Sequence, residues 1–370
     1  MKFRYVFPIL VITFGLIALT PVQAGGRQDQ TEETEHNHAA AQEHNEEGEK
    51  EEFSAREFIF DHIGDSHQWH VFTMPDGHHV NLYLPVILYS KSSGFHIFSS
   101  KKLAHGNTHK NFMLVEEGEY AGKITELDNE GNIKEDLPLD VSMTRNVASM
   151  MFVATLLLFL FIGLARSYRK TGVSAPKGIQ GFLEPIVLFV RDDIALPNIG
   201  EEKYGRFMPY LLTVFFFILF NNLLGLVPVI PGGSNVTGNI AVTFTLAFFS
   251  MVMINVNGSK AYWKDIFNTP GVPWWLKFPI PLMPVVELIG VIAKPFALMI
   301  RLFANITAGH IVVLSLVALI FIFDSLAVAP LSIFMVLFMD ILELLVAFIQ
   351  AYVFTLLTAL FIGLAVQEHH

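Results

Sequence analysis

The chain has 370 residues, of which 52% are hydrophobic and 13% aromatic, and its formal net charge is −10. This composition, with a mean hydropathy of +0.48, excludes an ordinary soluble domain and favours a membrane protein. The sequence contains no cysteine, which excludes disulfides and thiolate metal sites. The acidity lies at the front, since residues 1–140 hold 23 acidic and 11 basic side chains.

Residues 1–24 are typical of a cleavable secretory signal. Lys2 and Arg4 precede an apolar run at 5–20, and small residues follow up to Ala24. The alternative is an uncleaved first transmembrane helix, for which the run of 16 residues is slightly short. Both interpretations put the segment after Ala24 outside the cytoplasm.

Residues 25–52 are acidic and almost devoid of large apolar side chains, so we expect a disordered segment. Of the 14 histidines, 11 lie between His36 and His109, and metal binding is one interpretation of them. Their irregular spacing and the lack of an H-E-x-x-H motif favour scattered surface histidines instead, so we predict no metal site.

Residues 53–140 contain short apolar runs separated by turn signals, which predicts a small β-rich extracytoplasmic region. The runs lie at 79–90, 94–100 and 121–127, and LDNEGN marks a turn at 127–132. We find no catalytic constellation in this region.

Residues 141–370 contain the long apolar segments of a polytopic membrane domain, with an interfacial helix expected at 179–194. The last two segments are too long to stand upright. At about 1.5 Å per residue the first of them extends about 65 Å, twice the hydrocarbon thickness of about 30 Å. They must tilt strongly, bend or break, and Pro284 and Pro295 are candidate bend points. About five crossings are predicted, at 147–165, 207–230, 236–255, 281–323 and 331–366.

The positions of Lys and Arg predict the orientation of these crossings. The loops at 231–235 and 324–330 contain neither residue, so the positive-inside rule assigns them to the outside and the C-terminus to the cytoplasm. The predicted fold class is an all-α polytopic membrane protein preceded by a small β-rich extracytoplasmic region. The predicted cytoplasmic stretches contain Arg166, Arg169, Lys170, Lys177, Arg191, Lys203, Arg206, Lys260, Lys264 and Lys277.

A few polar residues interrupt the last two apolar segments with a regular spacing. Glu287, Lys294 and Arg301 are seven residues apart, which drifts only about 20° per step on a helix, so they form one stripe. Asn305 continues the stripe about 40° away, whereas His310 is turned by about 180°. Arg301 and His310 are therefore expected to face different neighbours.

The final segment repeats this spacing with Glu343 and Gln350, and Asp340 lies about 60° from Glu343. If the two segments run antiparallel, His310 and Glu343 lie about 17 and 16 residues from the midpoint of their connection, at matching depth. Such a pair is a plausible proton relay, because imidazole titrates near pH 6.5. The alternative is a buried pair that only locks two helices together.

Arg301 has a different role, because a guanidinium stays protonated and cannot relay protons. It can act only as a fixed positive charge, and the small residues Ala304, Ala308 and Gly309 would let a partner helix approach. The nearest anion on its stripe, Glu287, is about four turns away, so its partner is expected on another chain. Snorkelling to the interface is disfavoured, since apolar sequence continues on both sides.

At this point the sequence resembles a known family, the a subunit of bacterial F-type ATP synthase. The resemblance rests on KPFALMIRLFANITAGH and LELLVAFIQAYVFTLLTALFIGLA, with FNNLLGLVP and TGNIAVTFTLAF, and runs from about Ser142 to the end. It implies that Arg301 is the essential arginine, with Asn305 after it and Gln350 opposite. It also implies polar positions at Glu287 and Lys294 on the cytoplasmic side, and at Asn222 on the outer side.

The sequence departs from many members of the family at two places. His310 and Glu343 resemble the members in which these two residue types are exchanged, and Gly225 stands where some relatives have a carboxylate. Residues 25–140 exceed what the family needs. The predicted organisation is therefore a signal peptide at 1–24, an acidic segment at 25–52, a β-rich region at 53–140 and a membrane stator domain at 141–370.

The resemblance implies a non-catalytic subunit without cofactors that conducts protons through two offset half-channels. The outer one would be lined by His310, Glu343, Asp340 and Asn222, and the inner one would be reached past Glu287. The implied partners are a rotating c-ring, b-type peripheral stalk subunits and membrane lipid, with no nucleic acid, in a bacterial inner membrane. The sequence leaves H⁺ and Na⁺ open as coupling ion.

Two rival functions are weaker. A self-contained secondary transporter for an ion or metal should show paired repeat halves, and we find none. A membrane hydrolase should show a metal or nucleophile motif, and these are missing as well.

Overall fold

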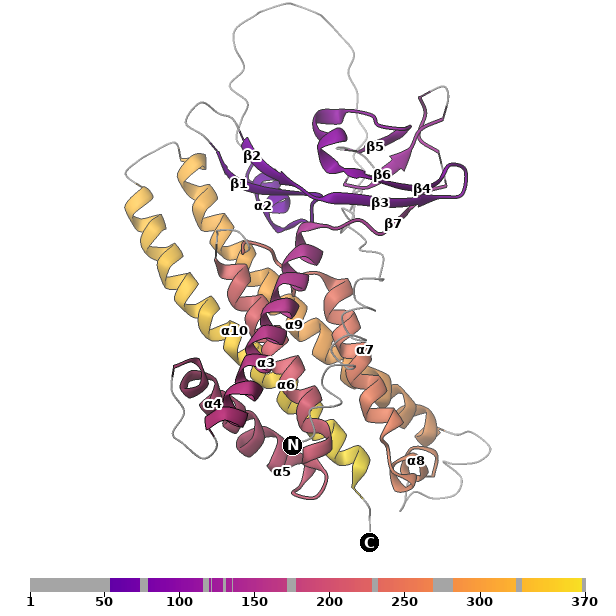
Figure 1. Ribbon diagram of the computed structural model, residues 1–370, viewed down its shortest axis with the longest axis vertical. Helices are drawn as coiled ribbons and strands as arrows, with labels where there is room; N and C mark the ends of the chain where they lie inside the picture. Colours follow the sequence, from indigo (N-terminus) through magenta and orange to yellow (C-terminus); the bar gives the residue numbers. More distant parts are fainter. Residues whose placement is uncertain are drawn as a thin grey trace, which may run out of the picture.

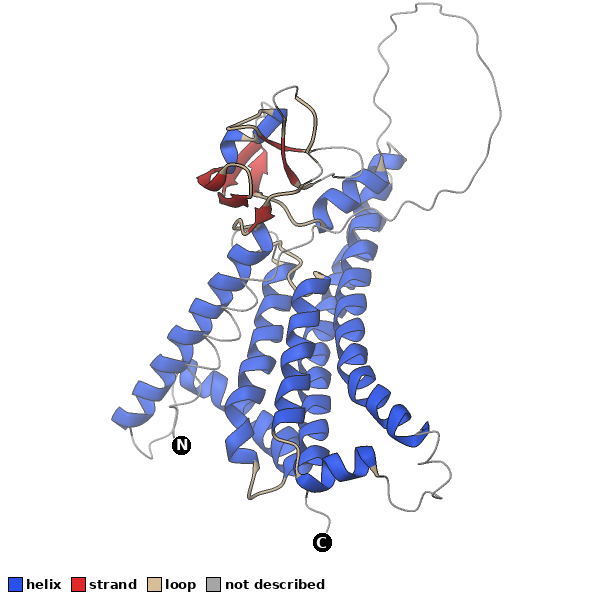
Figure 2. Ribbon diagram, turned by 90° about the vertical axis from the view of Figure 1, so that its right-hand side faces the viewer, coloured by secondary structure: helices blue, strands red, loops and turns tan. Residues whose placement is uncertain are grey.

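The computed structural model describes residues 54–73, 79–115, 120, 122–128, 131–134, 136–171, 178–227, 232–268, 282–323 and 328–367. The predicted signal peptide and acidic segment lie outside the described residues. Figure 1 shows a set of long helices with a group of strands at one end. Figure 2, turned by 90°, shows the strands at the same end again, while the C-terminus lies at the other.

The group of strands follows the predicted apolar runs and adds three strands to them. The run at 79–90 divides into two strands at Leu84. Three antiparallel sheets form, with strand orders β1-β2, β4-β3-β7 and β5-β6. The elements are α2 (Ala55–Ile63), β1 (Gln68–Thr73), β2 (His79–Tyr83), β3 (Pro85–Ser90), β4 (Gly94–Ser99), β5 (Phe112–Leu114), β6 (Ile124–Glu126) and β7 (Leu139–Asp140).

The core of this region comes from alternating positions. Val86 and Leu88 of β3 are fully buried and pack with Phe112 and Ile124, which β5 and β6 contribute. Because successive side chains of a strand point to opposite faces, one face of β3 is thereby fixed toward β5 and β6.

Among the described residues, four helices of the membrane part are long and apolar enough to span a bilayer, namely α3, α6, α9 and α10. The segment predicted as a span at 236–255 forms only α7, which turns by 102° into α8, so a fifth span exists if this bent pair counts as one. The elements are α3 (Arg145–Thr171), α4 (Ile179–Phe189), a π-helical segment (Val190–Ala195), α5 (Leu196–Ile199), α6 (Tyr204–Leu226), α7 (Ile240–Val256), α8 (Lys260–Phe267), α9 (Leu282–Ile322) and α10 (Ala329–Val366).

The two longest helices are α9 and α10, which pack against each other and run diagonally in Figure 1. Their 41 and 38 residues correspond to about 60 Å and 57 Å. Of the outcomes expected from the sequence, breaking does not occur, since α9 continues through Pro295. Pro284 lies in the first turn of α9, where a missing N–H costs no helical hydrogen bond.

Both ends of the helix set are fastened by specific contacts. At the end near the strands, Phe58 of α2 meets Phe321 of α9 with ring centroids 6.2 Å apart. At the other end, Lys203 Nζ donates to the carbonyl of Val366 at 2.8 Å and Ser259 N donates to that of Ala365 at 2.8 Å. These bonds satisfy carbonyls that the end of α10 would otherwise leave unpaired.

Candidate functional site

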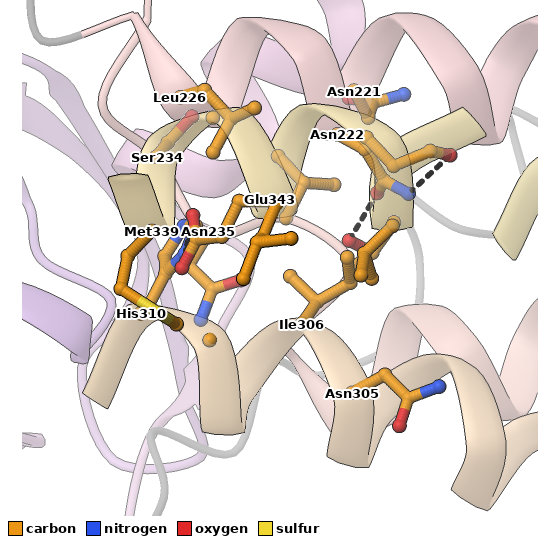
Figure 3. Close-up of a pocket in the computed structure, with 17 residues that line it drawn as sticks. Asn221, Asn222, Leu226, Ser234, Asn235, Asn305, Ile306, His310, Met339 and Glu343 are labelled. Carbon is orange, nitrogen blue, oxygen red and sulfur yellow. Dashed lines mark hydrogen bonds and ion pairs between the residues drawn. The ribbon is translucent and has the colours of Figure 1, made fainter. Parts of the chain in front are cut away.

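A cavity of about 190 Å³ lies among α6, α9 and α10. A cavity needs about 10–15 Å³ to hold one water molecule, so this cavity has room for several water molecules. Figure 3 shows the lining side chains gathered around this space. They are Asn221, Asn222, Gly225, Leu226, Ser234, Asn235, Val236, Thr237, Asn305, Ile306, Gly309, His310, Met339, Leu342, Glu343, Val346 and Ala347.

His310 of α9 and Glu343 of α10 meet in the cavity. His310 Nδ1 lies 3.3 Å from Glu343 Oε2, and the two side chains are only 18% and 10% exposed. The depth match predicted from the antiparallel helices is therefore confirmed. A carboxylate this close to an imidazole can exchange a proton with it.

Several polar atoms around this pair are buried without a partner. Glu343 Oε1 accepts no hydrogen bond from any residue that the structure describes, and the same holds for Asn221 Oδ1 and Ser234 Oγ. Asn235 Nδ2 likewise has no acceptor within the described ranges. Because buried polar groups are almost always hydrogen-bonded, these atoms point to ordered water in the cavity.

Two glycines allow the chain to approach the pair closely. A Cβ placed on Gly309 would lie 2.6 Å from Glu343 Oε1, so only glycine leaves room for this carboxylate. A Cβ on Gly225 would lie 3.2 Å from the carbonyl oxygen of Ser234 and 3.7 Å from His310 Nε2. The position where some family members have a carboxylate is thus next to the imidazole.

Asn222 of α6 links the cavity wall to α10. Its Oδ1 accepts a 2.6 Å hydrogen bond from Thr237 Oγ1, and its Nδ2 donates to the carbonyl of Ala347 at 3.5 Å. Asn222 is buried, so both bonds are shielded from bulk solvent. Asn222 is the polar residue that the sequence analysis assigned to this position, and the two hydrogen bonds hold its amide in one orientation.

Sequence reasoning missed four of the polar residues that line the cavity, namely Asn221, Ser234, Asn235 and Thr237. Asn221 and Thr237 were interpreted as parts of spans, and Ser234 and Asn235 as part of a turn. The available signal was a cluster of small polar residues between two apolar segments. That signal could not identify a cavity, because only the packing of α6 against α9 and α10 brings the cluster to His310.

Arg301 lies on the opposite side of α9, as the predicted stripe requires. It is exposed, and no hydrogen bond or ion pair reaches it from any other residue in the described part of the chain. Ala304 and Ala308 beside it are exposed too. Asn305 belongs to both sides, since it is exposed with Arg301 and also lines the cavity.

The other predicted residues of α10 differ in their surroundings. Gln350 is 3% exposed, but no hydrogen bond to Arg301 is present among the described residues. Asp340 is exposed one turn before Glu343 and interacts electrostatically with both Glu343 and His310. The structure therefore groups Asp340 with the cavity pair, as the helical spacing predicts.

Glu287 and Lys294 stand apart from the cavity, near the end of α9 that lies beside α8 (Figure 1). Lys294 Nζ lies 5.5 Å from the ring centroid of Phe361 on α10. Glu287 interacts electrostatically with Tyr262 of α8. Both are partly buried, so the predicted stripe continues along α9 to this end.

This arrangement suits proton exchange. It holds an acid and an imidazole in a cavity with room for water, and a permanent cation on an exposed helix face. Within the described ranges, no group of three or more His, Asp or Glu side chains could hold a metal ion. The histidines at 36–44 lie outside those ranges.

Comparisons with known proteins match two parts of this chain. A family model described as ATP synthase A chain matches residues 148–363, and one described as a domain of unknown function matches residues 58–145. ATP synthase subunit a of Chloroherpeton thalassium is 47% identical over 239 residues, covering 62% of this chain and 69% of that protein. ATP synthase subunit a 2 of Chlorobaculum tepidum is 47% identical over 233 residues, covering 61% and 64%.

ATP synthase subunit a of Myxococcus xanthus is 45% identical over 259 residues, which cover 68% of this chain and 82% of the relative. The family match covers more than half of the chain and includes all three helices that line the cavity. The four candidate spans, or five with the bent pair, fit a multi-pass protein of the bacterial inner membrane. The chain belongs to the ATP synthase A chain family, and it is a non-catalytic, proton-translocating membrane subunit of that enzyme.

Proposed function

We propose that the cavity is part of an outer half-channel and that the exposed face of α9 meets a rotating c-ring. The observation that supports this is that α9 carries two different ionisable side chains on opposite faces. α9 contributes His310 to an enclosed acid–imidazole pair 3.3 Å across, and nine residues earlier it exposes the unpaired Arg301. A route for protons and a barrier to them thus occupy opposite faces of α9.

On this proposal, protons enter from the outside and pass through the hydrated cavity. Asn222 lines this cavity, Asp340 lies one turn before Glu343 outside its lining, and His310 and Glu343 hand the proton onward. The exchange of histidine and acid between α9 and α10 is tolerated because the two positions touch, so either arrangement keeps one acid and one imidazole in contact.

Arg301 acts on the carboxylate that arrives with the ring. A protonated carboxylic acid can face lipid at little cost, and after nearly a full turn it meets the guanidinium, which favours the ionised form and so releases the proton. Arg301 also blocks direct leakage between the two half-channels. Asn305 and Gln350 flank this position on α9 and α10.

The released proton leaves on the other side of the membrane, past Glu287 and Lys294. These residues lie toward the end of α9 beside α8, away from the cavity. The positive-inside pattern supports a cytoplasmic location for this end. The mature N-terminus would then be in the periplasm after cleavage of residues 1–24, and b-type stalk subunits would complete the stator.

A test of the relay uses the exchange of its two members. Each of His310→Glu and Glu343→His alone leaves two like groups at 3.3 Å, so we expect proton flux in reconstituted vesicles to fall about tenfold or more. The double variant restores one acid and one imidazole, and partial recovery of flux is expected. Assembly with the ring and the ATPase head, measured by co-purification, serves as the control.

Losses that simply add in the double variant would show that the two residues act independently, and the relay would be abandoned. Full activity in either single variant would remove that residue from the route altogether.

A further inference from the structure

The three-stranded sheet β4-β3-β7 has an apolar face that nothing in the described chain covers. Its cross-strand register sets Tyr89 of β3 between Phe95 of β4 and Leu139 of β7. Each of these three side chains is between 52% and 63% exposed. The open face, as we call it, consists of Ile87, Tyr89, Phe95, Ile97, Leu139 and Val141.

This face is unusual because the other face of the same sheet is already apolar. Val86 and Leu88 point into the core of the region. The residues on the opposite face of the sheet ought to be polar if water covered them. Antiparallel sheets with one face in water normally alternate apolar and polar residues. An exposed apolar patch of this kind marks an interaction surface.

The open face points toward the end of the helices. β5 and β6 cover the buried face, and Figure 1 shows both of them farther from the helices than β3, β4 and β7. The same view shows the β3–β4 hairpin reaching sideways beyond α3. The open face therefore lies over the region beside the spanning helices rather than over the helices themselves.

The chain also ties this face to the membrane boundary. Val141 lies four residues before Arg145, where the spanning helix α3 begins, a distance of at most about 13 Å. Exposed apolar side chains continue along α3 with Met151 and Phe152. Exposed apolar side chains therefore lie on both sides of this short connection.

The charges near the face fit a lipid surface. None of the six residues of the open face is charged, whereas exposed lysines lie at both ends of β4. Lys101 lies just after it, and Lys91 lies in the turn before it, where its Nζ is 3.5 Å from Oδ2 of the equally exposed Asp136. Aromatic side chains beside lysine are typical of the membrane interface, where the rings sit at headgroup level and the lysines meet anionic lipids.

We propose that the open face docks on the outer leaflet of the membrane beside α3 and partly enters its headgroup layer. The extracytoplasmic region then has a fixed height and tilt above the bilayer instead of standing free in the periplasm. This inference rests on the proposed orientation, which places the strands outside the cytoplasm, but it does not depend on the proposed proton route.

Because this chain contains no cysteine, an introduced cysteine is its single thiol labelling position. Single variants Phe95→Cys and Ile97→Cys are spin-labelled in the complete ATP synthase, reconstituted in vesicles of phosphatidylcholine and phosphatidylglycerol. Collision rates with oxygen, which concentrates in lipid, and with a water-soluble nickel chelate are measured at each label. Thr108→Cys is the matched control, since Thr108 is exposed on the layer that covers the other face of the sheet.

We expect the ratio of oxygen to nickel collision rates to be several-fold higher at positions 95 and 97 than at 108. Equal ratios at all three positions would show that the face is in water and would overturn the proposal. Protection from both reagents at 95 and 97 would also overturn it, because that result means a protein partner. Tyr89→Cys on β3 repeats the measurement should a β4 variant fail to assemble.

Discussion

The two sides of α9 accommodate an ionisable group in a membrane in opposite ways. On one side, His310 is enclosed and touches Glu343 across 3.3 Å, with space for water around them. On the other side, Arg301 is exposed without a partner in the described chain, among small and apolar residues. The first site is complete within this chain, whereas the second needs another molecule to supply its counter-ion.

This difference teaches how one helix can serve a stationary route and a moving partner. A proton relay needs fixed contacts at hydrogen-bond distance, and α6 and α10 provide them permanently. A contact with a passing carboxylate must form and break, so it cannot be satisfied by a neighbour in the same chain. The predictions below test each side of α9 and then the region outside the membrane.

The largest effect is expected for Arg301→Ala. Removal of the only permanent charge on this part of the exposed face should reduce proton-driven ATP synthesis to background while the complex still assembles. Lys294→Ala, seven residues earlier on the same stripe, removes a charge from the proposed exit route only, so synthesis should fall less and remain measurable. Substantial synthesis by the Arg301 variant would contradict the assigned difference between the two faces.

A strong effect is also expected for Gly309→Ala on the cavity side. The added Cβ would lie 2.6 Å from Glu343 Oε1, so the carboxylate must move away from His310 and proton flux should fall about tenfold. Gly290→Ala in the same helix gains the same methyl group with nothing within 4 Å, and it should keep its flux. Equal behaviour of the two variants would mean that the geometry at Glu343 does not limit flux.

A smaller effect is expected for Asn222→Leu. The variant loses the hydrogen bonds to Thr237 and Ala347, each worth about 1 kcal/mol, and removes an amide from the cavity. Proton flux should fall a few-fold without loss of assembly, measured by acidification of vesicles during ATP hydrolysis. An unchanged flux would exclude Asn222 from the route and leave it a structural role.

Glu126→Gln in the extracytoplasmic region is expected to leave the proton flux unchanged and to affect only stability. Burial alone would raise the pKa of Glu126, but hydrogen bonds from Lys134, Ser90 and Ser92 outweigh it and lower the pKa from 4.5 to about 2. Lys134 Nζ is 2.7 Å away. Such a shift corresponds to a stabilisation on the order of 3 kcal/mol at neutral pH.

Because the pKa is lowered in the folded state, this stabilisation is complete above about pH 4.5 and is lost as the pH falls toward 2. Glu126→Gln should therefore destabilise the region at pH 7, and its difference from the parent should shrink at lower pH. Thermal unfolding reported by a fluorophore on Thr108→Cys measures this. Asp136→Asn, which breaks only the exposed pair with Lys91, should change little.

The spanning segments could be predicted because length and hydrophobicity determine them locally. The runs at 147–165, 207–230, 281–323 and 331–366 became α3, α6, α9 and α10 with small changes at their ends. The run at 236–255 likewise became α7, and beyond it the chain turns by 102° into α8. That bend depends on packing at the helix ends, where Ser259 bonds to the end of α10.

The strands were harder to predict, because short strands depend on their partners. β3 and β4 carry strong apolar patterns and were expected, whereas β7 has only two residues and exists because Leu139 and Asp140 pair with β3. The helix α2 was not expected at all. Its nine residues contact the end of α9, a contact that no local pattern predicts.

The sequence by itself determined the periodic features of this protein, namely the apolar runs, the stripe of Arg301 and the depth match between His310 and Glu343, because helix geometry is regular and can be counted. Only the tertiary structure decided which residues close the cavity. Ser234, Asn235 and Thr237 reach His310 because α6 packs beside α9 and α10, and Gly309 matters because a carboxylate from another helix fills the space beside it. Such contacts between distant segments follow from packing, which no local spacing encodes.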